Sequence, residues 1–490
     1  MHNRAWNRTC PAAFELDEHG VPCVFRPDSI SQHVREDGTP MRTSFFRQRP
    51  LIPPPIVHPH AAELYQISAI LDELPAAAEL VLKDLVGAKI DGDKGRRGMS
   101  AEQVLRVLLL KQMHEFSYED LEFHLADSAT YRTFCGIGFA DQAPSKSTLQ
   151  RNIKALSDQT LEAIHRMIVD YALREGIDDG RRARIDSTVV NAAIHEPSDS
   201  SLLNDSVRVL VRLLRRARRW VKCEFKDHRR RAKRRALEIL RARSAEDRQL
   251  LYRDLIKVTE KSAKAALHAV AVLQQVRTGE LLQKEIDHLV QEMQYYIAAA
   301  HHVIDQTRRR VLQGETVPAP QKIVSIFEPH VDVIVKDRRQ TLYGHKVFLS
   351  AGKSGLVFDV VVPRGNPADA SLASSMIERH IEICGDPPQQ VAFDGGFTSQ
   401  QNLEEIKDLG VRDVAFSKSK GIAVDEMAKS PRIYRALRNF RAGIEAVISW
   451  LKRSFGLGRC DWRSFASFKA YIWGSVLAAN LLVIARSSAG

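Results

Sequence analysis

Three acidic residues stand in settings that suit metal-dependent chemistry. Asp186 lies in the stretch ARIDSTVV, Asp394 in QQVAFDGGF and Glu445 in FRAGIEAVISWLKRSFG. The first two lie in or at the end of short β-branched segments, and the third lies on an expected amphipathic helix. Carboxylates delivered by separate elements can converge and hold divalent cations that promote phosphodiester chemistry.

Each of these acids also has an ordinary structural explanation when it is taken alone. An aspartate at the end of a strand often forms a turn or caps a helix, and Glu445 could simply pair with Arg441 one turn away. Asp186 is harder to explain in this way. An ionised carboxylate within an apolar strand costs several kcal/mol unless it is paired or bound to a metal.

The expected helix around Glu445 carries two further charges on the same face. Arg441, Glu445 and Lys452 are separated by four and seven residues, a spacing that aligns them on a helix. An apolar stripe that we expect to face the core consists of Ile444, Val447, Leu451 and Phe455.

The positive charge of the chain is concentrated in one stretch. The 490 residues carry a net charge of +12, yet residues 208–243 alone contain 16 lysines and arginines against three acids. Such a concentration is typical of a surface that binds phosphate groups, with a solvated helix face as the alternative explanation. The composition therefore favours nucleic acid as the partner.

Other features argue against a metal-thiolate, disulfide-bonded or membrane protein. The six cysteines are scattered without metal-ligand spacing, which fits a reducing cytosol. The most apolar segment, residues 470–485, is shorter than the roughly 20 residues that a membrane-spanning helix needs. We therefore expect a cytoplasmic protein with this segment as a buried core helix.

The amino-terminal part divides into a leader and a helical region. Residues 1–60 show little periodicity, and we expect them to be disordered. Residues 61–180 show short helical patterns, one of them opened by a capping box of Ser100 and Gln103. A short helix with Lys146, Arg151, Asn152 and Lys154 favours a DNA-binding helix-turn-helix, although an ordinary helical bundle fits the same pattern.

Residues 181–490 mix strands and helices. After the expected strand at Asp186, a long helical region at 200–313 has two apolar seams, Leu203, Val207, Leu210 and Leu214, then Leu282, Ile286, Leu289, Met293 and Tyr296. Short strands are expected in KIVSIFEP, VDVIVKD, GHKVFLSAG and GLVFDVVVP, and later strands at Asp394 and in RDVAFSK alternate with helices. The pattern predicts an α/β fold with a mixed sheet and helices on its faces.

This order of elements resembles an RNase H-like fold. In that fold the first carboxylate lies on the central first strand, the second at the end of the adjacent fourth strand, and the third on a helix packed against them. Gly395 and Gly396 would let the chain turn sharply after Asp394. We predict an RNase H-like catalytic domain at 181–490, an all-α amino-terminal DNA-binding domain at 61–180, and a basic helical insertion at 200–313 after the first strand.

The same residues resemble bacterial insertion-sequence transposases of the DDE class. The spacing R-x3-E-x6-K at Arg441, Glu445 and Lys452 is similar to the end of their Y-R-E-K signature. The strings FRAGIEAVISWLKRSFGLGRC, VAFDGGFTSQQN and DSTVV-NAAIHEPSDSSLLND are most similar to the ISNCY group, and the resemblance extends over about residues 60–485. The tyrosine of the signature falls on Arg438, so its role cannot be carried over.

The resemblance implies a DNA transposase with Asp186, Asp394 and Glu445 as its catalytic, metal-binding triad. Two Mg²⁺ ions per active site, which Mn²⁺ could replace, would be bridged by Asp186. One site would cleave the ends of the element and transfer them to target DNA without a covalent protein–DNA intermediate. The partners would be double-stranded DNA, both the terminal inverted repeats and the target, and at least one further copy of the chain at the nucleoid.

The resemblance also implies which residues contact DNA. Arg441 and Lys452 would bind phosphates of the transposon end. We expect the arginines of the basic insertion to grip the DNA backbone without sequence preference, and these are Arg215, Arg216, Arg218, Arg219, Arg229, Arg230 and Arg231.

Two other functions fit parts of the sequence. A non-catalytic nucleic-acid-binding or scaffold protein would explain the basic region but not the settings of the three acids. A metal-dependent DNA nuclease that cuts without joining would explain both, because the residues alone do not separate cutting from joining.

Overall fold

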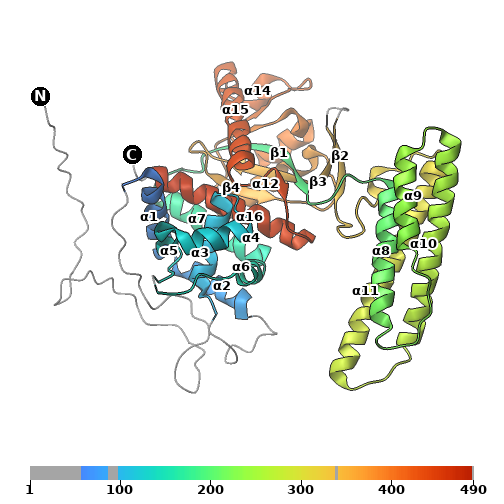
Figure 1. The fold of residues 1–490 in the computed structure, drawn as a ribbon. Helices are drawn as coiled ribbons and strands as arrows, with labels where there is room; N and C mark the ends of the chain where they lie inside the picture. Colours follow the sequence, from blue (N-terminus) through green and yellow to red (C-terminus); the bar gives the residue numbers. More distant parts are fainter. Residues whose placement is uncertain (1–56, 87–97, 139, 337–339, 488–490) are drawn as a thin grey trace, which may run out of the picture.

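A computed structural model describes residues 57–86, 98–138, 140–336 and 340–487. A central β-sheet has helices on its faces, and a separate bundle of long helices projects to one side (Figure 1). The predicted disordered leader, residues 1–60, lies almost entirely outside the described residues; the first helix begins at Pro59.

The sheet of the described residues has seven strands. They are β1 (Arg182–Ala192), β2 (Asp332–Lys336), β3 (Gln340–Ala351), β4 (Val357–Val361), β5 (Gln390–Phe393), β6 (Asp413–Phe416) and β7 (Arg459–Cys460). Their order is β2-β3-β1-β5-β6, with β4 also paired to β3 and β7 to β1. Because β1 is antiparallel to β3 and parallel to β5, the sheet is mixed, as predicted for an RNase H-like α/β fold.

One of the predicted strands is wrong. Residues 322–329, the segment KIVSIFEP, form no strand. The hydroxyl oxygen of Ser325 accepts hydrogen bonds from the backbone N–H groups of Phe327 and Glu328, which closes a turn. Ile326 is buried in the core of the helical bundle instead of a sheet, so packing against helices overrides the β-propensity of this segment.

The amino-terminal region is helical throughout its described residues. Its helices are α1 (Pro59–Asp72), α2 (Pro75–Val86), α3 (Ala101–Met113), α4 (Tyr118–Asp127), α5 (Ala129–Phe134), α6 (Lys146–Ile153) and α7 (Asp158–Arg174). The predicted capping box is confirmed, since Ser100 accepts from the Gln103 N–H and Gln103 accepts from the Ser100 N–H. These helices share one hydrophobic core with α16 (Phe465–Ser487) and the sheet.

The most apolar segment is a core helix, as predicted. Among the described residues, α16 is the one helix long and apolar enough to cross a membrane, but 89% of its most apolar window is buried within the protein. The side-chain amide of Asn480 donates to the Val357 carbonyl at 2.8 Å and accepts from the Val357 N–H at 2.9 Å. These bonds satisfy a buried polar side chain and tie α16 to β4.

Helices cover both faces of the sheet. On one face α12 (Ala373–Cys384) and α13 (Gln400–Asp408) pack against Ile185 and Phe348. On the other face lie α16 and α15 (Pro431–Ser454), preceded by the short α14 (Val424–Met427). The face covered by α15 is the one that carries the predicted acids.

A helical arm, residues 199–312, follows β1 and returns to the sheet before β2. It contains α8 (Asp199–Ala217), α9 (Arg229–Arg241), α10 (Ala245–Leu273) and α11 (Glu280–Thr307), and ends in a π-helical turn, Arg308–Leu312. The arm has its own hydrophobic core, and nearly all the predicted seam residues face it. Leu282 is the exception, with 47% exposure near the start of α11.

Candidate active site

Strand register brings Asp186 and Asp394 together. In the parallel pair of β1 and β5, Ile185 lies opposite Phe393, so Asp186 and Asp394 are the next residues along each chain. Side chains alternate across a strand, and the neighbouring buried pair, Ile185 and Phe393, points toward α12 and α13. The two aspartates therefore point to the opposite face, toward α15.

The chain passes from Asp394 into a short 3-10 turn, Gly395–Phe397. Both glycines are needed for close approach rather than for an unusual backbone angle, since neither has a positive φ. A methyl group at position 395 would lie 3.0–3.1 Å from the aliphatic carbons of Lys418, and one at 396 would lie 2.6 Å from an oxygen of Asp369. The predicted turn is present, and its glycines serve to admit neighbouring side chains.

Helix α15 carries Glu445 to the same place. Ser430 caps the helix by accepting from the Ile433 N–H, and Pro431 occupies its first turn. The apolar stripe predicted from the sequence is buried, with Ile444, Val447 and Leu451 at most 8% exposed. Burial of this stripe fixes the rotation of α15, so that Arg441 and Glu445 project over the aspartates.

One guanidinium group joins all three acids. Arg441 Nη2 lies 3.0 Å from Asp186 Oδ2 and 2.9 Å from Asp394 Oδ1, while Arg441 Nη1 lies 2.9 Å from Glu445 Oε1. The ordinary Arg441–Glu445 helix pair therefore exists, but as part of a cluster of four charges. Acids that are far apart in the sequence meet at a single cationic centre.

The three acids differ in exposure and in their acid–base properties. The side-chain exposures of Asp186, Asp394 and Glu445 are 12%, 38% and 64%. Burial, together with the nearby charge of Asp394, raises the pKa of Asp186 to about 6, although the Ser187 N–H and Arg441 act in the opposite direction.

Asp394 behaves differently from Asp186. Burial acts to raise its pKa, but hydrogen bonds from the Gly395 N–H and the Ser417 hydroxyl, with the charge of Arg441, hold that pKa below its usual value. The Ser417 hydroxyl donates to Asp394 Oδ1 at 3.0 Å. Asp394 is thus ionised at neutral pH, while the ionised form of Asp186 depends more strongly on a neighbouring cation.

The donor set suits a hard divalent cation. Such ions prefer carboxylate oxygens, and three of these oxygens already surround one positive group. Within the described residues, no group of three or more His, Cys, Asp or Glu side chains is arranged to hold a metal ion as it stands. The guanidinium of Arg441 occupies the space between the acids, so metal binding would require that side chain to move.

Lys452 lies further along the same helix face. Its Nζ donates to the Val189 carbonyl at 3.1 Å, which places it beside β1 rather than within the cluster of acids. The structure therefore brings four of the five core residues predicted for the site into direct contact and places the fifth beside them.

Arg184 is a residue of the site that the sequence reasoning missed. It lies two positions before Asp186 on the same face of β1, is 8% exposed, and donates to the Phe440 carbonyl at 3.3 Å. A methyl group at Gly443 would collide with its guanidinium, so the absence of a side chain at Gly443 lets α15 sit against β1. A charged residue in an apolar strand was the available signal.

Most of the arginines predicted on the arm have partners of their own. Arg215 and Arg229 both pair with Asp227 at 2.8 Å, Arg216 pairs with Glu292 at 2.5 Å, and Arg231 pairs with Asp254. Arg218 lies over the Phe225 ring, and Arg219 and Arg230 are exposed. None of the contacts described for these arginines involves the three acids.

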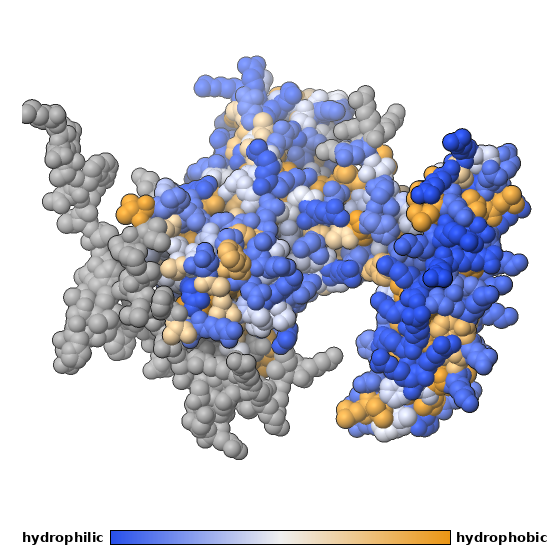
Figure 2. Space-filling model, viewed as in Figure 1, coloured by the Kyte–Doolittle hydropathy of each residue, from blue (hydrophilic) through white to orange (hydrophobic). Residues whose placement is uncertain are grey.

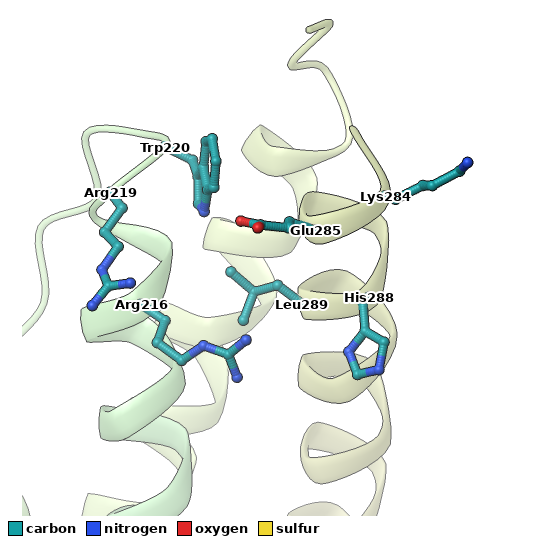
Figure 3. Close-up of a pocket in the computed structure, with 7 residues that line it drawn as sticks. All are labelled: Arg216, Arg219, Trp220, Lys284, Glu285, His288 and Leu289. Atoms are coloured by element: carbon teal, nitrogen blue, oxygen red, sulfur yellow. The ribbon is translucent and has the colours of Figure 1, made fainter. Parts of the chain in front are cut away.

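The surface of the arm is strongly hydrophilic in the view of Figure 2. A hollow between the end of α8 and the start of α11 is lined by Arg216, Arg219, Trp220, Lys284, Glu285, His288 and Leu289. In Figure 3, Arg219 and Trp220 come from the α8 side, while the side chain of Glu285 points across from α11. Basic side chains outnumber acidic ones in its lining, with Arg216, Arg219 and Lys284 against Glu285.

The helix predicted to read DNA is α6. Lys146 pairs with Glu119 at 2.8 Å, and Asn152 is buried and donates to the Thr148 carbonyl at 2.9 Å. Arg151 and Lys154 are exposed. Two of the four polar residues therefore serve the bundle itself, and two remain available to a partner.

Comparison with known proteins identifies the class. Residues 335–481 match the family model described as a transposase DDE domain, and residues 56–155 match one described as a transposase domain (DUF772). The first match contains Asp394 and Glu445. Asp186 and the helical arm lie between the two matched segments.

A relative in Rhizobium meliloti, described as uncharacterized protein ORF8 in the nfe locus, is 29% identical over 123 residues. That stretch is 24% of this chain and 59% of the relative, so the chain spans somewhat more than half of that protein's length. No solved structure matches the chain.

The chain belongs to the insertion-sequence transposases of the DDE class. Members of this class act on DNA and typically use divalent metal ions. The matches identify the class and do not test the resemblance to the ISNCY group, which stays a prediction.

Proposed function

We propose that this protein is a DNA transposase that cleaves the ends of an insertion sequence and joins them to target DNA, with Asp186, Asp394 and Glu445 as its catalytic triad. The observation that carries the proposal is the convergence of these acids, from β1, the end of β5 and α15, on one cationic group. A scaffold protein would have no need of three acids gathered in this way.

In the proposed mechanism Asp186, Asp394 and Glu445 would hold Mg²⁺, with Mn²⁺ as a substitute. Two bound Mg²⁺ ions would supply activation of the attacking hydroxyl group and stabilisation of the leaving 3′-oxygen. Asp394 is prepared for this role because its low pKa keeps it ionised. Arg441 would give up its contacts with all three acids, and its guanidinium would become free to bind a DNA phosphate.

The other charged regions are proposed to hold the DNA. Lys452 binds a phosphate near the cleavage site, the helical region at 61–180 binds the terminal repeats, and the arginines of the arm bind the DNA backbone. The ion pairs of the arm are surface pairs, each worth about 0–1 kcal/mol, so phosphate groups can displace them. Because a synaptic complex joins two ends, we propose that two or more copies assemble in the cytoplasm on chromosomal DNA.

The test is a cleavage assay on DNA from the border of the reading frame. Asp394→Asn keeps the size of the side chain but removes its charge, and we expect it to bind DNA normally and to lose Mg²⁺-dependent cleavage. Asp408→Asn, at the end of α13, is a matched control that removes an aspartate charge outside the site. Cleavage by Asp394→Asn at the parental rate would refute the assignment.

A second assay separates a transposase from a nuclease that only cuts. Supplied with border DNA that is already cleaved, a transposase joins the exposed 3′-OH to a target duplex, whereas a nuclease leaves it unjoined. We expect strand-transfer products that require all three acids. Their absence, with cleavage intact, would favour the nuclease.

A further inference from the structure

Three exposed cations, at the end of β6 and on α15, have no acidic partner among the described residues. Lys418 follows β6, and Arg435 and Arg438 lie on α15 before Arg441. All three are exposed, and within the described part of the chain no ion pair or side-chain hydrogen bond engages their charged groups. An exposed cation without a partner contributes little to the stability of the fold, so these three side chains are available to bind a ligand or another macromolecule.

The position of Arg438 follows from its spacing on α15. It precedes Arg441 by three residues and Glu445 by seven, a spacing that puts all three on one face of α15. The Tyr434 hydroxyl donates to the Phe416 carbonyl at 2.9 Å, which fixes this turn of α15 against the end of β6. The Arg438 guanidinium lies 6.0 Å from the centre of the Tyr434 ring. Arg438 therefore lies on the face of α15 that carries Glu445, next to the turn anchored at the end of β6.

Lys418 lies close to Asp394 on the sheet side of the site. Its neighbour Ser417 donates to Asp394, and its aliphatic carbons pack close to Gly395. A side chain at position 395 would push Lys418 away. Because Gly395 has no side chain, the aliphatic part of Lys418 can lie beside it, next to Asp394. The ammonium group of Lys418 stays in solvent.

The neighbouring sequence supplies no acid to neutralise the two arginines. From Met427 to Ile444 the chain has five basic residues and no aspartate or glutamate. The arginines of the arm, by contrast, mostly have carboxylate partners. Unpaired cations on the elements that carry the acids suit phosphate groups better than cations that are already neutralised.

We propose that Lys418, Arg435 and Arg438 form a phosphate-binding rail that holds the DNA backbone beside the scissile bond. The inference rests on the proposed function and adds the residues that position its substrate. Arg438 stands at the position of the signature tyrosine and brings a positive charge to it. The contact is to the backbone, because long exposed side chains without fixed partners position DNA and do not read its sequence.

The experiment measures the affinity of the full chain for a short DNA duplex of mixed sequence, in EDTA, over a series of salt concentrations. We expect the double variant Arg435→Gln/Arg438→Gln to lower the slope of log K against log salt by about 1.8, or about 0.9 for each phosphate group that is no longer bound. Lys418→Gln is expected to lower it by about 0.9. The matched control is Arg174→Gln/Lys353→Gln, which removes two exposed charges that have acidic partners elsewhere.

Three outcomes decide the question. A slope reduced in the rail variants but not in the control supports the rail. An unchanged slope in the rail variants overturns it, and an equal reduction in the control also overturns it, because the effect would then follow net charge alone. Cleavage of border DNA by the parental protein is measured in parallel, so failure of the proposed function, which shows as no parental cleavage, is distinguished from failure of the rail.

Discussion

The arm and helix α15 are both rich in arginine, but their arginines have different partners. On the arm most of the predicted DNA-binding arginines pair with acids of the same bundle, such as Asp227 and Asp254. On α15, Arg435 and Arg438 have no acidic partner among the described residues, and Arg441 binds three acids that come from different elements. The net charge of a region therefore does not measure the positive charge that is available to a partner.

The two regions also differ in what holds them in place. The arm has a hydrophobic core of its own and a seam of interlocking apolar residues. The charged half of α15 is held against β1 by a buried arginine, Arg184, that passes beneath Gly443. A small change at α15 should therefore disturb chemistry, whereas a similar change on the arm should only adjust binding.

We expect the largest effect on cleavage from Gly443→Ala. The added methyl group meets the buried guanidinium of Arg184, so α15 must shift, and a displacement of about 1 Å can lower a catalytic rate about 100-fold. Overpacking of this kind also costs about 1–3 kcal/mol of stability. Single-turnover cleavage and thermal unfolding are the measurements.

Its control is Ala442→Ser, at an exposed position one residue away, which should leave both quantities unchanged. The double variant Gly443→Ala/Arg184→Ala should recover part of the cleavage lost in Gly443→Ala, because the colliding group is gone. Parental cleavage by Gly443→Ala would show that the seating of α15 does not depend on this contact.

A second prediction concerns Arg441. Its guanidinium competes with a metal ion for the three acids, so Arg441→Gln should bind Mn²⁺ in the absence of DNA about tenfold more tightly, a change of about 1.4 kcal/mol. Cleavage should fall in the same variant, because glutamine carries no charge to hold the DNA phosphate. Calorimetric titration with Mn²⁺ measures the first effect, and weaker Mn²⁺ binding would contradict the competition.

The smallest effect is expected on the arm. Arg229→Gln/Arg231→Gln removes two surface ion pairs, each worth about 0–1 kcal/mol, so stability should change little. DNA affinity at low salt should fall a few-fold, and cleavage of bound DNA should stay at the parental rate. A loss of cleavage as large as that of Gly443→Ala would show that the arm takes part in catalysis, and would contradict the proposed division between the arm and α15.

Much of the site could be predicted because its signals are local. The β-branched runs around Asp186 and Asp394 and the apolar stripe of α15 follow the side-chain periods of strands and helices. The segment at 322–329 shows the limit of that reasoning, since β-branched residues there pack against the arm.

The contacts between side chains that are far apart in the sequence could not be predicted, because they depend on the folded structure. The sequence contains Arg184, Arg441 and Ser417, but only the folded register shows that the first passes under α15 and that the other two bind Asp394. Likewise, the acids that neutralise Arg216 and Arg231 lie on other helices of the arm. Charge counted along the chain misses these long-range pairs.

We propose that Asp186, Asp394 and Glu445, which come from separate elements, form one metal site. The most direct test of this proposal is the number of Mn²⁺ ions bound to the complex with border DNA, measured by electron paramagnetic resonance for the parental protein and for Asp186→Asn, Asp394→Asn and Glu445→Gln. We expect each substitution alone to lower Mn²⁺ occupancy while DNA stays bound. Parental occupancy in all three variants would contradict it.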